Sequence, residues 1–113
     1  MVAAELAAHA FEVHIPHLAT IETTSALRTF LLRSLISAER ARAAIDDLQD
    51  FAAIRHPHEP YLERAWALRH TVSAYDGLYV AMAEEIGATL VTCDARLARA
   101  PLTGVTIALV EPT

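Results

Sequence analysis

The chain has 113 residues, 54% of them hydrophobic, so it is long enough for one domain with a core and too apolar to be disordered. Its single cysteine excludes an internal disulfide and a thiolate zinc cluster. The net charge of −5, with arginine as the only basic residue type apart from histidine, argues against a protein that coats nucleic acid non-specifically. From this length we expect one domain over residues 1–113. Because no apolar run approaches the roughly 20 residues that span a bilayer, we also expect no membrane contact and a cytoplasmic location.

The first half of the chain predicts mostly helices. In chain order we expect the end of a helix over 2–10, a strand over 11–15, helices over 17–35 and 37–51, and a strand over 52–56. Pro16 ends the first strand, and Ser37 fits the N-cap of the second long helix, with Glu39 in its first turn. Pro57 and Pro60 then indicate a turn.

The second half alternates helices with apolar strands. We expect helices over 61–70 and 73–86, a strand over 89–92, a helical turn over 94–100 and a strand over 105–110. Gly87 is the predicted end of the helix over 73–86. Alternating helices and apolar strands are typical of an α/β fold with a parallel sheet covered on both faces. The active site of such a fold lies beyond the carboxyl ends of its strands.

Three acidic residues stand out because they interrupt otherwise apolar patterns. Glu22 lies on the long helix over 17–35, Asp76 lies early in the apolar helix over 73–86, and Asp94 follows the strand TLVTC. An ionised carboxylate in apolar surroundings is costly unless it is paired or binds a metal. Carboxylates gathered at one sheet edge would suit Mg²⁺ or Mn²⁺, which prefer oxygen ligands.

Each of these acids also has a purely structural interpretation. Ser73 and Asp76 match a capping box, and Asp94 is a good N-cap for the turn after it. Glu22 would then be a solvated residue on a helix. No single acid decides between the two interpretations, and their combination favours the functional one.

Two segments resemble a known family. The stretches IPHLATIETTSALR (15–28) and TVSAYDGLYVAMAEEIGATLVTCDARLARA (71–100) resemble the PIN domains of VapC-type toxins. The second stretch is the more specific, with Tyr-Asp-x-x-Tyr-Val-x-x-Ala-Glu followed by Leu-Val-Thr-x-Asp. The likeness covers most of the chain, from about residue 12 to residue 110.

The resemblance implies a three-layer αβα sandwich with a mostly parallel sheet and an endoribonuclease activity that depends on Mg²⁺ or Mn²⁺. The toxin would cleave structured RNA such as tRNA, would be inhibited by a cognate antitoxin and is expected to form a homodimer. The family's metal-binding acids match Glu22, Asp76 and Asp94, and its hydroxyl residue before the last acid matches Thr92. Arg28 and Arg96 are candidate phosphate contacts, with ordinary surface charges as the alternative.

The chain departs from the family at its start. Family members open with a short strand, central in the sheet, that ends in an aspartate, and here Met1 leads directly into the end of the following helix. We expect this first, central strand and its carboxylate to be missing. A start assigned too far downstream is the favoured explanation, and a genuine truncation that leaves an inactive relic is the other.

Several further motifs carry no function in this interpretation. The pairs His14/His17 and His56/His58 are interpreted as surface or turn histidines rather than a zinc site. Cys93 is predicted to be a small core residue. The aromatic residues Trp66, Tyr75 and Tyr79 are predicted to be core or dimer contacts rather than base-stacking platforms. Neither a nucleophile elbow nor a glycine-rich phosphate loop occurs.

Two functions therefore remain open. The first is a metal-dependent endoribonuclease, the toxin of a type II toxin–antitoxin system. The alternative is a catalytically impaired PIN-like remnant that dimerises or binds an antitoxin, using apolar grooves on the helices over 17–35 and 37–51. An unrelated small α/β signalling domain is disfavoured because it would need an aspartate after a first strand.

Overall fold

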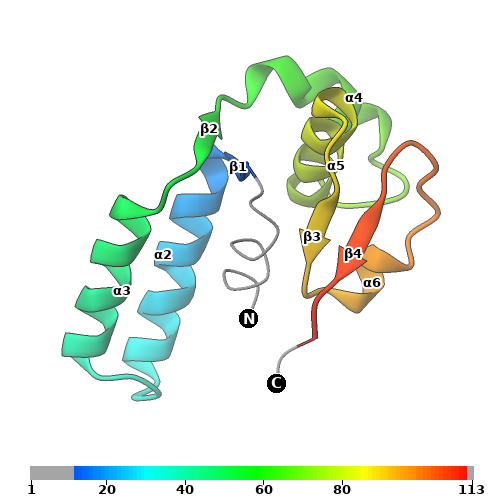
Figure 1. Cartoon of the computed structure of the whole chain (residues 1–113). Coiled ribbons are helices and arrows are strands. Elements are labelled where there is room, and N and C mark those ends of the chain that lie inside the picture. Colours follow the sequence, from blue (N-terminus) through cyan, green and yellow to red (C-terminus); the bar gives the residue numbers. More distant parts are fainter. Residues whose placement is uncertain (1–11, 112–113) are drawn as a thin grey trace. The chain divides into compact units, whose positions relative to one another are not determined.

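The structure is a computed structural model that describes residues 12–111 (Figure 1). The helix predicted over residues 2–10 lies outside the described residues. Contacts divide the chain into two compact units, which we call the N-terminal unit (described residues 12–56) and the C-terminal unit (described residues 57–111). The single domain expected over residues 1–113 stays a prediction.

The N-terminal unit is a helical hairpin held between two short strands. Its elements are β1 (His14–Pro16), α2 (His17–Leu32), α3 (Ala38–Asp50) and β2 (Ile54–His56). The strands pair in parallel, with His14 opposite Ile54 and Pro16 opposite His56. The helices pack against each other, and neither contains a fully buried residue.

The turn between the two helices follows from local capping. Helix α2 ends at Leu32 rather than at Leu35, because Ser34 takes a left-handed conformation with φ of 58°. The Ser34 amide donates to Leu31 O and the Leu35 amide to Phe30 O, which is the Schellman arrangement. The Ser37 hydroxyl then accepts from the Arg40 amide at 3.0 Å, so the predicted N-cap of α3 is confirmed.

The C-terminal unit contains the buried core. Its elements are the 3₁₀ turn η1 (Glu59–Tyr61), α4 (Leu62–Ala67), α5 (Ala74–Ile86), β3 (Leu90–Thr92), α6 (Ala95–Ala98) and β4 (Ile107–Leu109). Strands β3 and β4 pair in parallel, with Leu90 opposite Ile107 and Thr92 opposite Leu109. The core cluster consists of Leu68, Val80, Ala83, Leu90 and Leu97, among which Val80 has no exposed surface. Gly87, with φ of 72°, ends α5 as predicted.

The predicted alternation of helices and parallel strands is confirmed. The described strands form two separate two-stranded sheets, β1–β2 and β3–β4, one in each unit, so the fold is α/β with parallel pairing. Across residues 12–111, no helix combines the length and the apolar character that crossing a membrane requires.

Trp66 and Tyr75 are not core residues, so of the two roles predicted for them only a dimer contact stays a prediction. Trp66 is 68% exposed, whereas Ala65 of α4 and Leu68, the C-cap of that helix, are buried. Tyr75, in the first turn of α5, is 63% exposed, whereas Tyr79 packs on the core cluster as predicted. The prediction that Cys93 is a core residue is wrong. Cys93 is exposed because β3 ends one residue before it, at Thr92.

Candidate active site

The carboxylate of Asp94 is held by the backbone at the end of β3. Its Oδ1 accepts from the Arg96 amide at 2.9 Å and from the Leu97 amide at 3.4 Å, so Asp94 is the N-cap of α6. The structural interpretation of this acid is therefore confirmed. Within the described part of the chain, Oδ2 of Asp94 makes no hydrogen bond, and the residue is exposed. One oxygen is thus fixed by backbone amides, and the other has no hydrogen-bond partner among the described residues, so this exposed carboxylate can accept a ligand.

Thr92 fixes the backbone of the same acid. Its Oγ1 accepts from the Asp94 amide at 3.0 Å, across the single residue between them. The hydroxyl therefore positions Asp94 relative to the end of β3. The family resemblance predicted a hydroxyl that orients water or ligand at this place, and that role stays a prediction.

Asp76 is the third residue of α5. The Ser73 hydroxyl accepts from the Asp76 amide at 3.1 Å, which confirms Ser73 as the N-cap of this helix. The residue is half-buried, the least exposed of the three predicted acids. Its position in the first turn also places its negative charge where the helix dipole stabilises it.

Glu22 lies on α2, in the N-terminal unit, and is exposed. Glu22 and Asp94 are therefore exposed, so the expectation of apolar surroundings is wrong for these two acids. For Asp94 the physical reason is that β3 ends at Thr92 and the chain turns at the surface. For Glu22 the reason is that no residue of α2 is fully buried.

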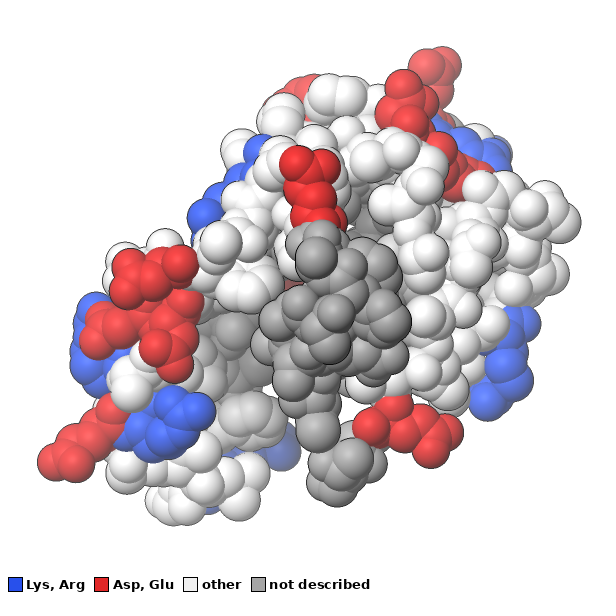
Figure 2. Space-filling view, viewed as in Figure 1, with Lys and Arg blue, Asp and Glu red and all other residues white. Residues whose placement is uncertain are grey.

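The two predicted phosphate contacts are both exposed arginines. Arg28 lies on α2 and Arg96 in the first turn of α6, two residues after Asp94. On the face drawn in Figure 2, basic and acidic side chains are interspersed and form no continuous basic stripe.

The described residues do not by themselves form a metal cage. Within each unit, as described over residues 12–56 and 57–111, no three His, Cys, Asp or Glu side chains converge as a metal site. Asp76 and Asp94 belong to the C-terminal unit and Glu22 to the N-terminal unit. Carboxylate oxygens do fit the ligand preference of Mg²⁺ and Mn²⁺. The donor chemistry of the three predicted acids therefore suits these ions.

One side-chain contact was missed by sequence reasoning. Nδ1 of His14 lies 2.8 Å from Nε2 of His56, across the paired strands β1 and β2. The two histidine pairs were seen in the sequence and set aside as surface or turn residues, which is wrong for His14, whose side chain is only 16% exposed. The sequence does not reveal this contact, because it joins one histidine of the first pair to one histidine of the second pair.

An acid capped at the end of a parallel strand, within alternating helices and strands, agrees with the family comparison. The model of the PIN domain matches residues 1–102, so the chain belongs to the PIN domain family. Within that family it is of the VapC type.

Three relatives from Mycobacterium tuberculosis illustrate the similarity. Ribonuclease VapC1 is 49% identical over 87 residues, which are 76% of this chain and 65% of that protein. Ribonuclease VapC9 is 40% identical over 85 residues, 75% of this chain and 67% of that protein. Ribonuclease VapC12 is 38% identical over 87 residues, 77% of this chain and 67% of that protein. The chain thus spans about two thirds of the length of the curated relatives that it matches.

Proposed function

We propose that this chain is a metal-dependent endoribonuclease, the toxin of a type II toxin–antitoxin system. The observation that carries the proposal is the carboxylate of Asp94, fixed through one oxygen and open at the other, in a chain of the PIN domain family. The relatives named ribonuclease VapC support the same activity. An RNA substrate also favours the cytoplasm as the place of action.

Glu22, Asp76 and Asp94 are the proposed ligands of Mg²⁺ or Mn²⁺. When bound, such an ion neutralises charge on the phosphodiester and promotes attack by water. Asp94 is presented by the amides of α6, and Thr92 keeps its backbone at the end of β3. Asp76 is oriented by the first turn of α5, which the Ser73 hydroxyl caps.

The proposed substrate is a structured RNA such as tRNA. Arg28 and Arg96 are the proposed phosphate contacts, since an arginine donates two parallel hydrogen bonds to a phosphate. With few basic side chains available, RNA affinity should be modest and should fall steeply with salt. A cognate antitoxin and a second copy of the chain are the proposed protein partners.

The second candidate is a catalytically impaired remnant that binds antitoxin or dimerises without cutting RNA. It is supported by large apolar side chains exposed along and just after α2, such as Ile21 at 61%, Leu32 at 65% and Leu35 at 65%. A surface of this kind suits an amphipathic helix of a partner. It requires no metal and no cleavage.

Asp94→Asn separates these candidates, because asparagine keeps the capping oxygen and loses the charge. The matched control is Asp47→Asn, which removes the same charge from an exposed position on α3. If the proposal holds, Mn²⁺ raises the melting temperature of the unaltered chain and of Asp47→Asn, and both cut tRNA. Asp94→Asn then loses both properties while its metal-free melting temperature stays close to that of the unaltered chain.

Cleavage by Asp94→Asn at the unaltered rate, or cleavage that persists in EDTA, would overturn the nuclease assignment. Absence of both the Mn²⁺ shift and cleavage in the unaltered chain, together with binding of an antitoxin peptide, would favour the remnant. Asp76→Asn repeats the test at an independent position and should give the same loss.

A further inference from the structure

The N-terminal unit contains a histidine pair that the proposed nuclease does not use. His14 and His56 lie on paired strands, where His14 is opposite Ile54 and His56 is opposite Pro16, so the two imidazoles are diagonal neighbours on one face. Their ring centroids are 5.1 Å apart, and Nδ1 of His14 lies 2.8 Å from Nε2 of His56. Both atoms are ligand types that bind transition metals.

A carboxylate determines which nitrogen of His14 faces its partner. Nε2 of His14 lies 3.2 Å from Oε2 of Glu12. Because a carboxylate only accepts hydrogen bonds, Nε2 of His14 carries the proton and donates to Glu12, and Nδ1 of the neutral ring directs its lone pair toward His56. Nε2 of His56 is then the donor in the contact between the rings. Glu12, His14 and an ion would thus form the carboxylate–histidine–metal arrangement of many metal sites.

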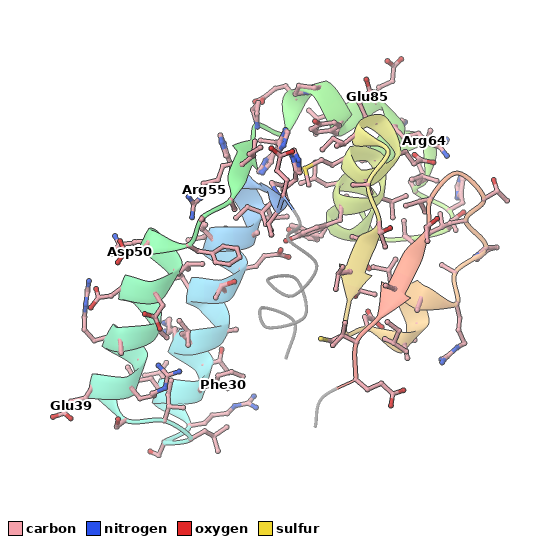
Figure 3. The ribbon with its side chains drawn as sticks, viewed as in Figure 1. Phe30, Glu39, Asp50, Arg55, Arg64 and Glu85 are labelled. Atoms are coloured by element: carbon pink, nitrogen blue, oxygen red, sulfur yellow. The ribbon has the colours of Figure 1, made fainter. Side chains whose placement is uncertain are left out.

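The opposite face of β2 is occupied differently. Figure 3 labels Arg55, which extends from β2 toward α3, and its Nη2 donates to Leu48 O at 3.1 Å. Because successive residues of a strand point to opposite faces, this guanidinium is directed away from the face that carries His56. The cation of Arg55 therefore does not share a face with the two imidazoles.

From this geometry we propose that His14 and His56 bind a borderline transition-metal ion such as Zn²⁺, with Glu12 as the positioning residue behind His14. Two imidazole nitrogens on a tetrahedral Zn²⁺ lie about 3.3 Å apart, so the rings must separate by roughly half an ångström from their present 2.8 Å. Water would complete the coordination, because among residues 12–111 no third His, Cys, Asp or Glu converges there. The ion would exchange readily and would tie β1 to β2 at the base of the α2–α3 hairpin.

The proton balance of this binding follows from the tautomers. His14 binds through Nδ1 and keeps the proton on Nε2, which remains hydrogen-bonded to Glu12. His56 binds through Nε2, so its proton moves to Nδ1 through solvent. No net proton is released when both rings start neutral.

Nitrogen NMR of the histidine rings tests this assignment in the unaltered full chain. At a pH of about 8, above the ordinary titration range of histidine, Zn²⁺ is added to protein labelled with ¹⁵N. We expect the Nδ1 resonance of His14 and the Nε2 resonance of His56 to shift together, and the exchange of the Ile54 amide, which donates to Val13 O, to slow. Zn²⁺ that leaves both ring resonances in place would overturn the proposal.

Variants give the second arm of the test. His14→Gln and His56→Gln should each abolish the rise in melting temperature caused by Zn²⁺, and Glu12→Gln should weaken Zn²⁺ binding by about tenfold. His70→Gln, an exposed histidine of the C-terminal unit, is the matched control and should keep the full shift. A Zn²⁺ shift that survives in both His14→Gln and His56→Gln would contradict the site.

The histidine site and the proposed nuclease site share no residue, so single variants distinguish them. Asp94→Asn should lose the Mn²⁺ shift and keep the Zn²⁺ shift, and His56→Gln should do the reverse. Loss of both shifts in either single variant would show that one site serves both ions, which would overturn the assignment of a separate histidine site.

Discussion

Gly77 of α5 lies so close to the backbone of Ala65 in α4 that a side chain there would need this backbone to shift by a few tenths of an ångström. A Cβ on Gly77 would lie 3.2 Å from the carbonyl oxygen and 3.3 Å from the Cα of Ala65. Both residues are buried, and these two helices make the most extensive contact between elements of the C-terminal unit. This close approach brings α5, which carries Asp76 in its first turn, against α4.

Gly77→Val should therefore destabilise the chain. Backbone atoms of Ala65 cannot move aside cheaply, and overpacking of this kind costs about 1–3 kcal/mol. Chemical denaturation monitored by circular dichroism measures the change. Ala74→Val, an exposed position on the same helix, is the control and should cost only the small difference in helix propensity. Equal stability of the two variants would contradict the close packing.

Arg64 and Glu84 form a bidentate ion pair between α4 and α5. Nε donates to Oε1 at 2.8 Å and Nη2 to Oε2 at 3.1 Å, and the side chains are 50% and 17% exposed. Because solvent screens a half-exposed partner, a double-mutant cycle of Arg64→Ala and Glu84→Gln should give a coupling energy of about 1 kcal/mol or less. A coupling several times larger would mean that the pair is effectively shielded from water.

The arginine side of this ion pair should be insensitive to pH. The hydrogen bonds that Arg64 donates to Glu84, and then the negative charge of Glu84, raise the pKa of Arg64 above its ordinary value. A raised pKa stabilises the folded state fully below the unfolded value and loses the effect only as pH rises through the folded value. Because arginine stays protonated well beyond the working pH range of proteins, titration of Arg64 should not change the coupling energy between roughly pH 6 and pH 10. Repeating the cycle at both ends of this range checks the expectation.

Gly87 ends α5 in a left-handed conformation that alanine adopts poorly. Its φ is 72°, and the Ala88 amide donates to Ala83 O at 2.9 Å to close the cap. Gly87→Ala should lower the free energy of unfolding by about 1 kcal/mol, whereas Gly87→Asn should cost less because asparagine tolerates this region. Thermal unfolding compares the variants. The interpretation of the cap would be wrong if alanine proved as stable as glycine.

The hydroxyl of Thr92 should increase the affinity of the proposed site for its metal ion. Thr92→Val keeps the shape of the side chain and removes the acceptor of the Asp94 amide, whereas Thr92→Ser keeps the acceptor. If Asp94 is a ligand, Thr92→Val should weaken Mn²⁺ binding by about tenfold, as loss of outer-shell support commonly does. Titration calorimetry with Mn²⁺ measures the effect, and Thr92→Ser should retain near-normal affinity. Equal affinities in the two variants would remove Thr92 from the site.

The local features of this fold were readable from the sequence because each depends on residues a few positions apart. Ser37 and Ser73 cap α3 and α5, Asp94 caps α6, and Gly87 ends α5, all as predicted. A cap joins a side chain or amide to a backbone atom within about five residues, so the sequence alone specifies both partners. The end of α2 was missed because Ser34, and not glycine, takes the left-handed position.

Tertiary structure decided the contacts that join distant residues. His14 and His56 are 42 positions apart in the sequence and meet only because β1 and β2 pair in parallel in one register. The exposure of Trp66 and Cys93 was decided in the same way, by which face of α4 packs inward and by the residue at which β3 ends. For the candidate site, the sequence alone identified the acids through their motif and their capping positions. Their exposure followed from the ends and faces of the elements that carry them, because burial depends on packing between elements and is not encoded by neighbours along the chain.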